Sequence, residues 1–267
     1  MNAPLSESLV QILPRETTLR LVLNRPRARN ALSAELMAAL QSALDAAADD
    51  KNTRVVVLAA NGPVFSSGHD LKEMTAHRAD GDRGEAAFAA LFAQCSKLVQ
   101  SIVRHPKPVI AEVQGTATAA GCQLVASCDL AVAATNATFA TPGVNIGLFC
   151  STPMVALSRN VSRKHAMEML LTGNMITADE ARRIGLVNRV VDPTALDGET
   201  MKLARLIASK PVATVKTGKE AFYRQLEMGL SDAYDYASRV MTENMLAAEA
   251  REGIGAFIDK REPNWPE

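Results

Sequence analysis

The chain has 267 residues, with 29 lysines and arginines against 29 aspartates and glutamates, so its formal net charge is zero at pH 7. This balance argues against a general nucleic-acid-binding or polybasic membrane-binding surface, although it leaves room for a local basic patch. Hydrophobic residues make up 48% of the chain and aromatic residues only 4%, which predicts an α/β protein with a mainly aliphatic core.

The first sixteen residues contain neither a basic segment nor a long apolar run. We therefore expect no secretory signal, no transit peptide and no membrane span there. The cysteines show no CxxC spacing, which predicts reduced, mostly buried thiols of an intracellular protein rather than a disulfide framework. They are Cys95, Cys122, Cys128 and Cys150.

Strand and helix patterns alternate through the first half of the chain. Short apolar or alternating runs predict strands over residues 8–13, 18–23, 55–60, 108–113, 130–134 and 137–140. Apolar residues at helical spacing predict helices over 34–49, with Ser33 as N-cap, and over 86–104. Polar residues 75–84 predict a mobile loop. The alternation from strand to helix predicts a parallel sheet with crossover helices.

Helical patterns dominate after Pro153, and only residues 186–191 look extended. Helices are predicted over 153–159, 163–171, 177–184, 195–209, 213–228, 231–246 and 249–261. We therefore expect an α/β core over residues 1–195 and a helical region over residues 196–267. Helices this rich in alanine and methionine can bury their faces on another subunit or on their own core, and the pattern leaves both open.

Residues 115–129 follow the predicted strand over 108–113 and predict a tight turn and a helix, with only small residues from Thr116 to Gly121. Small residues let a ligand approach the backbone closely, and the first turn of a helix has N–H groups without an internal partner. Such a turn attracts negative charge, so it is a candidate for holding a developing oxyanion. Close packing of a helix on a sheet explains the same residues equally well.

Three stretches together, in their order and spacing, resemble the crotonase family, also called the enoyl-CoA hydratase/isomerase family. They are residues 23–32, residues 65–72 and residues 115–129, supported by residues 171–173, 181–187 and 255–261. The resemblance implies a crotonase-like α/β spiral of ββα units and a helical C-terminal region that builds trimers, often paired as hexamers. It also implies a coenzyme A thioester as ligand and neither a metal nor a redox cofactor.

The resemblance further implies that the backbone N–H groups of His69 and Ala120 hold the thioester oxygen while it gains enolate character. One such donor is typically worth ~3–4 kcal/mol to the transition state. Ala120 stands where the family usually has glycine, and its methyl group is tolerable if φ is negative. The His69 side chain is open to three interpretations: a bulky neighbour of the hole, a donor to a substrate carboxylate, or a proton-transfer group.

Other residues resemble the family's substrate-binding positions. Lys72 resembles the residue near the coenzyme phosphates, and a solvated surface lysine is the alternative. Asp70 is the simplest N-cap for a helix beginning near Leu71. Phe257 and Lys260 resemble terminal residues that reach the coenzyme of a neighbouring subunit.

The two acids of hydratase members are missing. Hydration needs a water activated at one carbon and a proton delivered to the next, and two glutamates do this in the family. Their places are taken here by Gln123, in Gly121-Cys-Gln-Leu124, and by Gly143, which follows Pro142. Loss of one such group typically costs ~10²–10⁴-fold in rate, so ordinary hydratase chemistry is doubtful.

Two other side chains are candidate replacements for the missing acids. Glu112 is unexpected in an apolar strand and could be a buried acid, although such a residue more often meets solvent or a basic partner at a strand end. Cys150 could line the acyl pocket, but no base is visibly paired with it, and inert packing is the simpler expectation.

Residues 119–129 and 140–153 resemble one branch of the family that carries the same glutamine and glycine. The chain begins almost directly at its first strand, so we expect a bacterial-type cytoplasmic location. Three functions stay open: an acyl-CoA enzyme that needs only the oxyanion hole, such as a decarboxylase of malonyl-type thioesters; a nominal hydratase or isomerase using water around Gln123 and Asn145; or a non-catalytic acyl-CoA binder.

Overall fold

The computed structural model describes residues 8–265, so the expectation about the first seven residues lies outside it. The strands are β1 (Val10–Arg15), β2 (Thr18–Leu23), β3 (Val55–Ala60), β4 (Val64–Ser66), β5 (Val109–Val113), β6 (Thr116–Thr118), β7 (Leu130–Ala134), β8 (Thr138–Ala140), β9 (Ile176–Thr177) and β10 (Arg189–Val191). The helices are α1 (Ala34–Asp49), α2 (Leu71–Ala76), α3 (Glu85–Val103), α4 (Ala120–Ser127), α5 (Ser151–Leu157), α6 (Arg163–Thr172), α7 (Ala178–Arg183), α8 (Leu196–Ala208), α9 (Val212–Gln225), α10 (Leu230–Leu246) and α11 (Ala248–Ile258).

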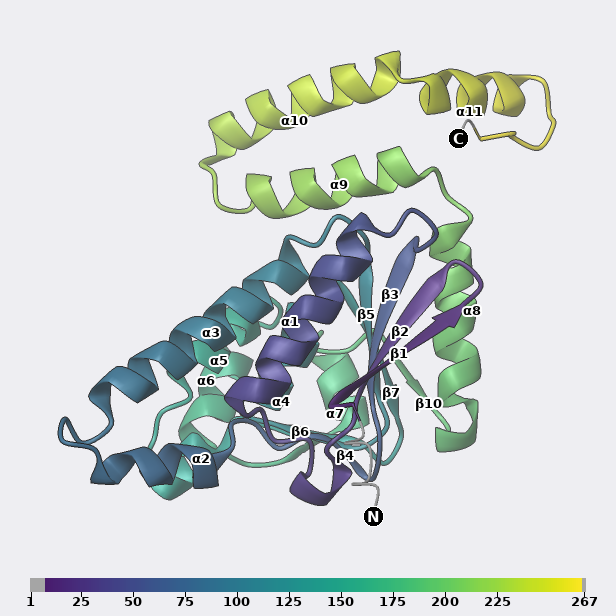
Figure 1. Ribbon diagram of the computed structural model, residues 1–267. Helices are drawn as coiled ribbons and strands as arrows, with labels where there is room; N and C mark the ends of the chain where they lie inside the picture. Colours follow the sequence, from purple (N-terminus) through teal and green to yellow (C-terminus); the bar gives the residue numbers. More distant parts are fainter. Residues whose placement is uncertain (1–7, 266–267) are drawn as a thin grey trace.

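Two sheets organise the chain (Figure 1). The larger has the order β1-β2-β3-β5-β7-β10, and every neighbouring pair in it is parallel except β1 with β2. The smaller has the order β4-β6-β8-β9, and its first three strands are parallel. The predicted parallel sheet with crossover helices and the predicted α/β class are therefore confirmed.

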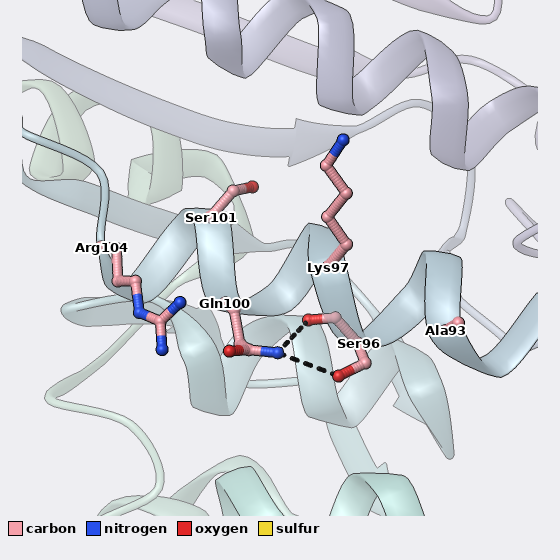
Figure 2. A pocket seen from close by; sticks show the side chains of 6 residues that line it. All are labelled: Ala93, Ser96, Lys97, Gln100, Ser101 and Arg104. Carbon is pink, nitrogen blue, oxygen red and sulfur yellow. Dashed lines mark hydrogen bonds between the residues drawn. The ribbon is translucent and has the colours of Figure 1, made fainter.

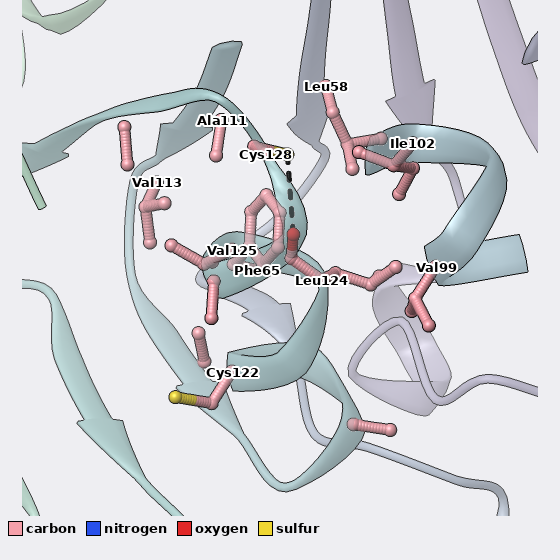
Figure 3. Packing of buried hydrophobic residues seen from close by; sticks show 14 of the residues in the cluster. Leu58, Phe65, Val99, Ile102, Ala111, Val113, Cys122, Leu124, Val125 and Cys128 are labelled. Atoms are coloured by element: carbon pink, nitrogen blue, oxygen red, sulfur yellow. Dashed lines mark hydrogen bonds between the residues drawn. The ribbon is translucent and has the colours of Figure 1, made fainter. Parts of the chain in front are cut away.

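The larger sheet buries both of its faces, because alternate residues of a strand point to opposite sides. On β5, Ala111 and Val113 belong to the main core on the side of α1, α3 and α4. Ile110 points to the other side, where it and Val57 of β3 belong to a second core with Leu203 of α8. Figure 3 shows the packing of α4 in the main core, where Leu124 and other α4 residues lie among side chains of β3, β5 and α3. All four cysteines are free and buried, as predicted.

Helix α1 has the bounds that the spacing predicts, and the Ser33 hydroxyl accepts a hydrogen bond from the Leu36 N–H at 3.2 Å. Helix α3 is long and apolar enough to span a membrane by length and composition alone. Its apolar residues nevertheless include Cys95, Leu98 and Ile102, which are fully buried in the core. We therefore interpret α3 as a core helix.

Two local predictions differ from the structure. The predicted mobile loop over 75–84 instead holds the end of α2 and a 3-10 turn over His77–Ala79, and the Asp82 carboxylate accepts N–H groups of Gly84 and Ala86. Strand β6 was not predicted, because three residues of small side chains carry no strand periodicity; its pairing with β4 and β8 defines it.

The last three helices leave the core (Figure 1). Helix α8 covers the larger sheet through Leu196, Leu203 and Ala204, so the predicted division between residues 195 and 196 places a core helix in the C-terminal region. By contrast, α9 and α10 contain no residue that is buried in this chain. Helix α9 is therefore the first C-terminal helix that adds no buried side chain to the core, which it contacts through the polar groups of Lys219 and Tyr223.

Candidate functional site

Three parallel strands of the smaller sheet end at one edge, and the predicted site residues follow them. His69 comes shortly after β4, Ala120 directly after the turn that ends β6, and Gly143 shortly after β8. Because the carboxyl ends of neighbouring parallel strands share an edge, the fold gathers residues that are more than 70 positions apart in sequence.

The backbone of His69 is oriented by its neighbours. The Leu32 N–H donates to the Gly68 oxygen at 2.8 Å, and the Leu32 oxygen accepts the Asp70 N–H at 3.2 Å. In such a parallel bridge the residue between the two bonded neighbours directs its own N–H to the opposite side. The His69 N–H therefore faces away from Leu32 and donates to no other group within residues 8–265.

The second donor lies beside this turn. Ala120 is the first residue of α4, where an N–H has no partner inside the helix. Gly68 has a φ of +90°, and a Cβ placed on it would lie 3.2 Å from the Ala120 nitrogen and 2.8 Å from the Ala119 methyl carbon. The structure therefore brings the turn that precedes His69 into contact with the start of α4.

Ala119 carries the backbone strain of this turn. Its φ of 50° and ψ of −119° are rare for a residue with a side chain, and such conformations cost of order 1–3 kcal/mol. Ala120 does not have a positive φ, so its methyl group meets the condition set by the sequence. Close packing also occurs in this stretch, since a Cβ on Gly121 would lie 2.3 Å from the Ser66 oxygen.

The His69 ring lies under α3. It packs edge-on against Phe92, with ring centroids 5.6 Å apart, and neither ring nitrogen has a hydrogen-bond partner or solvent contact. Burial lowers the pKa of His69 below its ordinary value, and the Leu32 backbone opposes that shift, so the structure favours the neutral ring with one N–H. This arrangement keeps the three interpretations of the ring open, and all of them now concern a neutral imidazole.

Burial also makes the stability of the fold depend on pH. The pKa values of His69 and His105 both lie below the ordinary 6.5, mainly because their rings are buried. Below pH ~6.5 the unfolded chain therefore binds more protons than the folded chain, and the free energy of unfolding must fall as the pH decreases. We expect urea denaturation to show lower stability at about pH 5.5 than at about pH 7.5. A His105→Gln variant should show a shallower dependence, and an unchanged slope would contradict this assignment.

Gln123 is 3% exposed and cannot exchange a proton near neutral pH. Among residues 8–265, its Oε1 accepts one long hydrogen bond, from the Cys95 Sγ at 3.8 Å. Burial raises the pKa of the Cys95 thiol to about 11. Cys95 lies one turn beyond Phe92 on α3, so the same helix contacts Gln123 and the His69 ring. The two side chains therefore occupy one region beneath α3.

Gly143 lies in a 3-10 turn over Pro142–Ile146, and its space is closed. A Cβ on Gly143 would lie 2.7 Å from the Leu148 oxygen and 2.9 Å from the Cys150 Sγ. The Leu148 N–H also donates to the Gly143 oxygen at 2.9 Å. This place therefore admits no side chain of any kind unless residues 148–150 move.

The candidate replacements do not supply an acid or a nucleophile. Glu112 faces α8 on the other side of the larger sheet and forms an ion pair with Arg20 at 2.5 Å. Burial raises the pKa of Glu112, and Arg20 opposes that shift. Burial likewise raises the pKa of the Cys150 thiol, which agrees with inert packing. Among residues 8–265 no three His, Cys, Asp or Glu side chains cluster in a way that could hold a metal ion.

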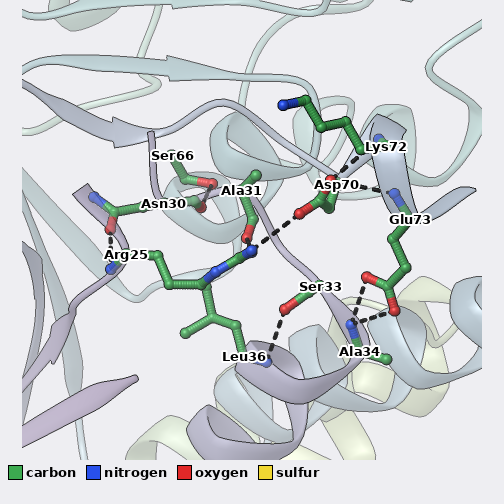
Figure 4. Close-up of polar contacts among 10 residues, drawn as sticks. All are labelled: Arg25, Asn30, Ala31, Ser33, Ala34, Leu36, Ser66, Asp70, Lys72 and Glu73. Carbon is green, nitrogen blue, oxygen red and sulfur yellow. Dashed lines mark hydrogen bonds and ion pairs between the residues drawn. The ribbon is translucent and has the colours of Figure 1, made fainter. Parts of the chain in front are cut away.

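Asp70 caps α2 as predicted, and its carboxylate accepts the N–H groups of Lys72 at 3.1 Å and Glu73 at 3.4 Å (Figure 4). Leu71 and Lys72 are exposed on this helix. Phe257 is 84% exposed on α11, which lies at the far end of the molecule from α4 (Figure 1). The chain therefore does not bring Phe257, or Lys260 beyond it, to its own predicted hole.

Two hollows lie beside α3. One of about 470 Å³ is lined by residues of α3 and by its C-cap Arg104, and contains no predicted site residue (Figure 2). The other, of about 220 Å³, lies between α1, α2 and α3 and includes Glu73 and Met74. Because Asp70 caps the helix that carries these two residues, the second hollow is the one adjoining the predicted site.

The structure adds a residue that the sequence did not indicate. Thr141 is 1% exposed, follows β8 at the same edge, and its hydroxyl has no hydrogen-bond partner. Only its pairing context could have identified it, since the Ala119 N–H donates to the Ala140 oxygen at 2.9 Å and so places residue 141 beside the start of α4.

Comparisons with known proteins show the family of this chain. A family model described as enoyl-CoA hydratase/isomerase matches residues 15–267. Enoyl-CoA hydratase domain-containing protein 3, mitochondrial, from Mus musculus is 50% identical over 245 residues, covering 92% of this chain and 80% of that protein. Among solved structures, an enoyl-CoA hydratase from Mycobacterium smegmatis has a TM-score of 0.93 at 52% identity, covering 97% of this chain and 99% of that chain. The human domain-containing protein 3 has a TM-score of 0.91 at 48% identity, covering 96% and 100%.

These findings confirm the family resemblance and the branch within it. They contradict the expected cytoplasmic location, because the mouse, human and frog relatives are all named as mitochondrial proteins. The location was inferred from the start of the chain, and that inference was wrong.

Proposed function

Because the chain belongs to the enoyl-CoA hydratase/isomerase family, we propose that it binds an acyl-CoA thioester with the carbonyl oxygen between the N–H groups of His69 and Ala120. The observation that carries this proposal is the bonding of Leu32 to both neighbours of His69, which leaves the His69 N–H free at an edge that contacts the start of α4. Two fixed donors at one point stabilise an oxygen that gains negative charge, because they need no reorganisation during the reaction. No metal or redox cofactor is required for this chemistry.

The proposal does not extend to hydration by two glutamates. Gln123 supplies a carboxamide in place of one acid, and the space at Gly143 is closed by Leu148 and Cys150. An enzyme of this form polarises a thioester but has no paired acid and base to add water across a double bond. Its chemistry, if it turns over, is that of a divergent lyase or isomerase.

A second candidate function is decarboxylation of a malonyl-type thioester, which the neutral and unpartnered His69 ring favours. In that reaction the bond between the α-carbon and the carboxylate breaks, and CO₂ leaves. The electron pair moves into the enolate, whose oxygen the two N–H groups hold, and a proton from solvent then adds to the α-carbon. The ring N–H would donate to the substrate carboxylate and orient it, so no general base is needed.

A ligand screen tests both candidates. We expect acyl-CoAs to raise the melting temperature, because a ligand at 100 times its Kd stabilises the folded state by ~2.7 kcal/mol. Acyl-CoAs whose acyl group carries a carboxylate should stabilise the folded protein more than those with an uncharged acyl group of equal length. The His69→Ala variant keeps the backbone N–H and should lose only this preference. The measurements are thermal shift, CO₂ release by mass analysis, and the enoyl absorbance of crotonyl-CoA, which should not decrease.

Each outcome separates the candidates. Stabilisation without CO₂ release from any malonyl-type thioester removes the decarboxylase and leaves a non-catalytic acyl-CoA binder. Rapid loss of the crotonyl-CoA absorbance contradicts the account of Gln123 and Gly143. If no acyl-CoA stabilises the protein more than coenzyme A itself, the proposed oxyanion hole is wrong.

We also propose that the chain self-associates as a trimer or hexamer through α9–α11. Their exposed apolar residues support this. The most exposed of these are Leu230, Leu246, Phe257 and Ile258, each more than 70% exposed. In such an assembly Phe257 and Lys260 would reach the coenzyme of a neighbouring subunit, and Lys72 would lie near the coenzyme phosphates. Burying these apolar side chains against a second copy of the chain removes them from water. This removal is the main favourable contribution to the free energy of association.

A further inference from the structure

We propose that the ion pair between Arg25 and Asp70 positions the backbone turn that presents the His69 N–H. Both residues are thus positioning residues of the oxyanion hole and do not contact substrate. This inference rests on the proposed function, since the turn matters only if the His69 N–H meets a thioester oxygen.

The Asp70 carboxylate divides its two oxygens between two tasks (Figure 4). Its Oδ1 accepts the N–H groups of Lys72 and Glu73 and so fixes the start of α2. Its Oδ2 accepts a hydrogen bond from the Arg25 guanidinium at 3.1 Å. The two side chains are only 24% and 16% exposed, so solvent screens this pair less than a surface pair.

Arg25 in turn holds the segment that pairs with the His69 turn. Its other terminal nitrogen donates to the Ala31 oxygen at 2.6 Å. The next residue, Leu32, bonds to Gly68 and Asp70 on either side of His69. One guanidinium therefore joins the carboxylate after His69 to the backbone that runs beside it, through two terminal nitrogens that the planar group holds at a fixed separation.

The same segment is fastened at its other end. Asn30 is fully buried, its Oδ1 accepts the Arg25 N–H at 2.8 Å, and its Nδ2 donates to the Asn61 and Val64 oxygens. The Ser66 hydroxyl donates to the Asn30 oxygen at 2.9 Å. The 25–32 segment is therefore fixed to both ends of β4. The Arg25–Asp70 pair adds a contact between this segment and the residue that follows His69.

The charge of Asp70 can be separated from its capping role. In an Asp70→Asn variant the amide oxygen still accepts the N–H groups at the start of α2, because asparagine is as good an N-cap as aspartate. The variant removes only the acceptor that faces Arg25. An Arg25→Lys variant keeps the positive charge but replaces the two nitrogens that contact Ala31 and Asp70 with one ammonium group.

Two measurements test the inference in the full chain. Hydrogen–deuterium exchange without ligand should increase in peptides that cover residues 66–74 in both variants, and in Arg25→Lys also over the paired residues 25–32. With a carbonyl-labelled [1-¹³C]acyl-CoA, the infrared carbonyl stretch of the bound ligand should return toward its value in free solution. Binding should weaken ~10-fold, which is less than the ~10²-fold that a 1 Å misplacement can cost in rate.

A matched control is Glu227→Gln, which breaks an exposed ion pair with Arg159 and should change neither measurement. Native exchange over 66–74 in both variants overturns the inference, whether or not any acyl-CoA binds. A native protein that binds no acyl-CoA, or that leaves its carbonyl stretch unshifted, refutes the proposed function instead. If Asp70→Asn does not fold, Arg25→Lys gives the same two readouts.

Discussion

Replacing Lys219 with methionine is expected to destabilise the protein by about 3–5 kcal/mol and to release α9–α11 from the core, because it leaves a buried carboxylate without its partner. The Lys219 ammonium lies 2.7 Å from an oxygen of Asp129, and the two side chains are 8% and 16% exposed. It also donates to the Ile102 and Lys107 oxygens. Burial lowers the pKa of Lys219, and the charge of Asp129 opposes that shift.

This contact has a large effect because α9 has no buried residue of its own. The Tyr223 hydroxyl donates to the other Asp129 oxygen at 2.9 Å, and the Val109 N–H also donates to Asp129. Asp129 therefore joins the end of the 115–129 stretch to the first C-terminal helix. Without the lysine, the helices proposed to carry self-association lose their fixed position on the core.

Urea denaturation and light scattering after size exclusion measure the two effects of Lys219→Met. The matched control is Glu220→Gln, which breaks an exposed pair with Arg224 on the same helix, where such pairs contribute ~0–1 kcal/mol. An unchanged oligomeric state and an unchanged free energy of unfolding in Lys219→Met would refute the assigned role. A loss of stability with the assembly intact would place the interface elsewhere.

Restoring the second hydratase acid by Gly143→Glu is expected to damage the fold rather than create activity. Even the Cβ of alanine would approach the Leu148 oxygen and the Cys150 Sγ below 3.0 Å. Overpacking of this kind typically costs 1–3 kcal/mol, and a buried carboxylate without a partner adds to it. We therefore expect Gly143→Ala to be destabilised by ~1–3 kcal/mol and Gly143→Glu by more.

A glycine in open space provides the control. Gly198 in α8 has no neighbouring atom within 4 Å of a built Cβ, so Gly198→Ala should stabilise the protein by up to ~1 kcal/mol. Gln123→Glu alone preserves shape but buries a carboxyl group without a charged partner, so it should fold with reduced stability. It should not hydrate crotonyl-CoA without the second acid. If the double variant Gln123→Glu, Gly143→Glu folds and hydrates crotonyl-CoA, residues 148–150 must move, and the closed space at Gly143 is not a barrier.

Local sequence patterns were enough to predict the periodic parts of the chain. Helix α1 and strand β3 have the predicted bounds because their apolar residues recur at clear helical or strand spacing over many positions. The cap at Asp70 was predictable because side-chain capping is a local interaction within a few residues. Three separate motifs together also identified the family.

The environment of the site depends on contacts between segments that are distant in the sequence. The closed space at Gly143 arises from Leu148 and Cys150, and the unpartnered His69 ring from packing under Phe92. The pairing of Leu32 across from His69 joins residues 37 positions apart, and no local propensity encodes such a contact. Sequence patterns report how each segment buries its own face, whereas burial, hydrogen-bond direction and free space at a site depend on what other segments place there.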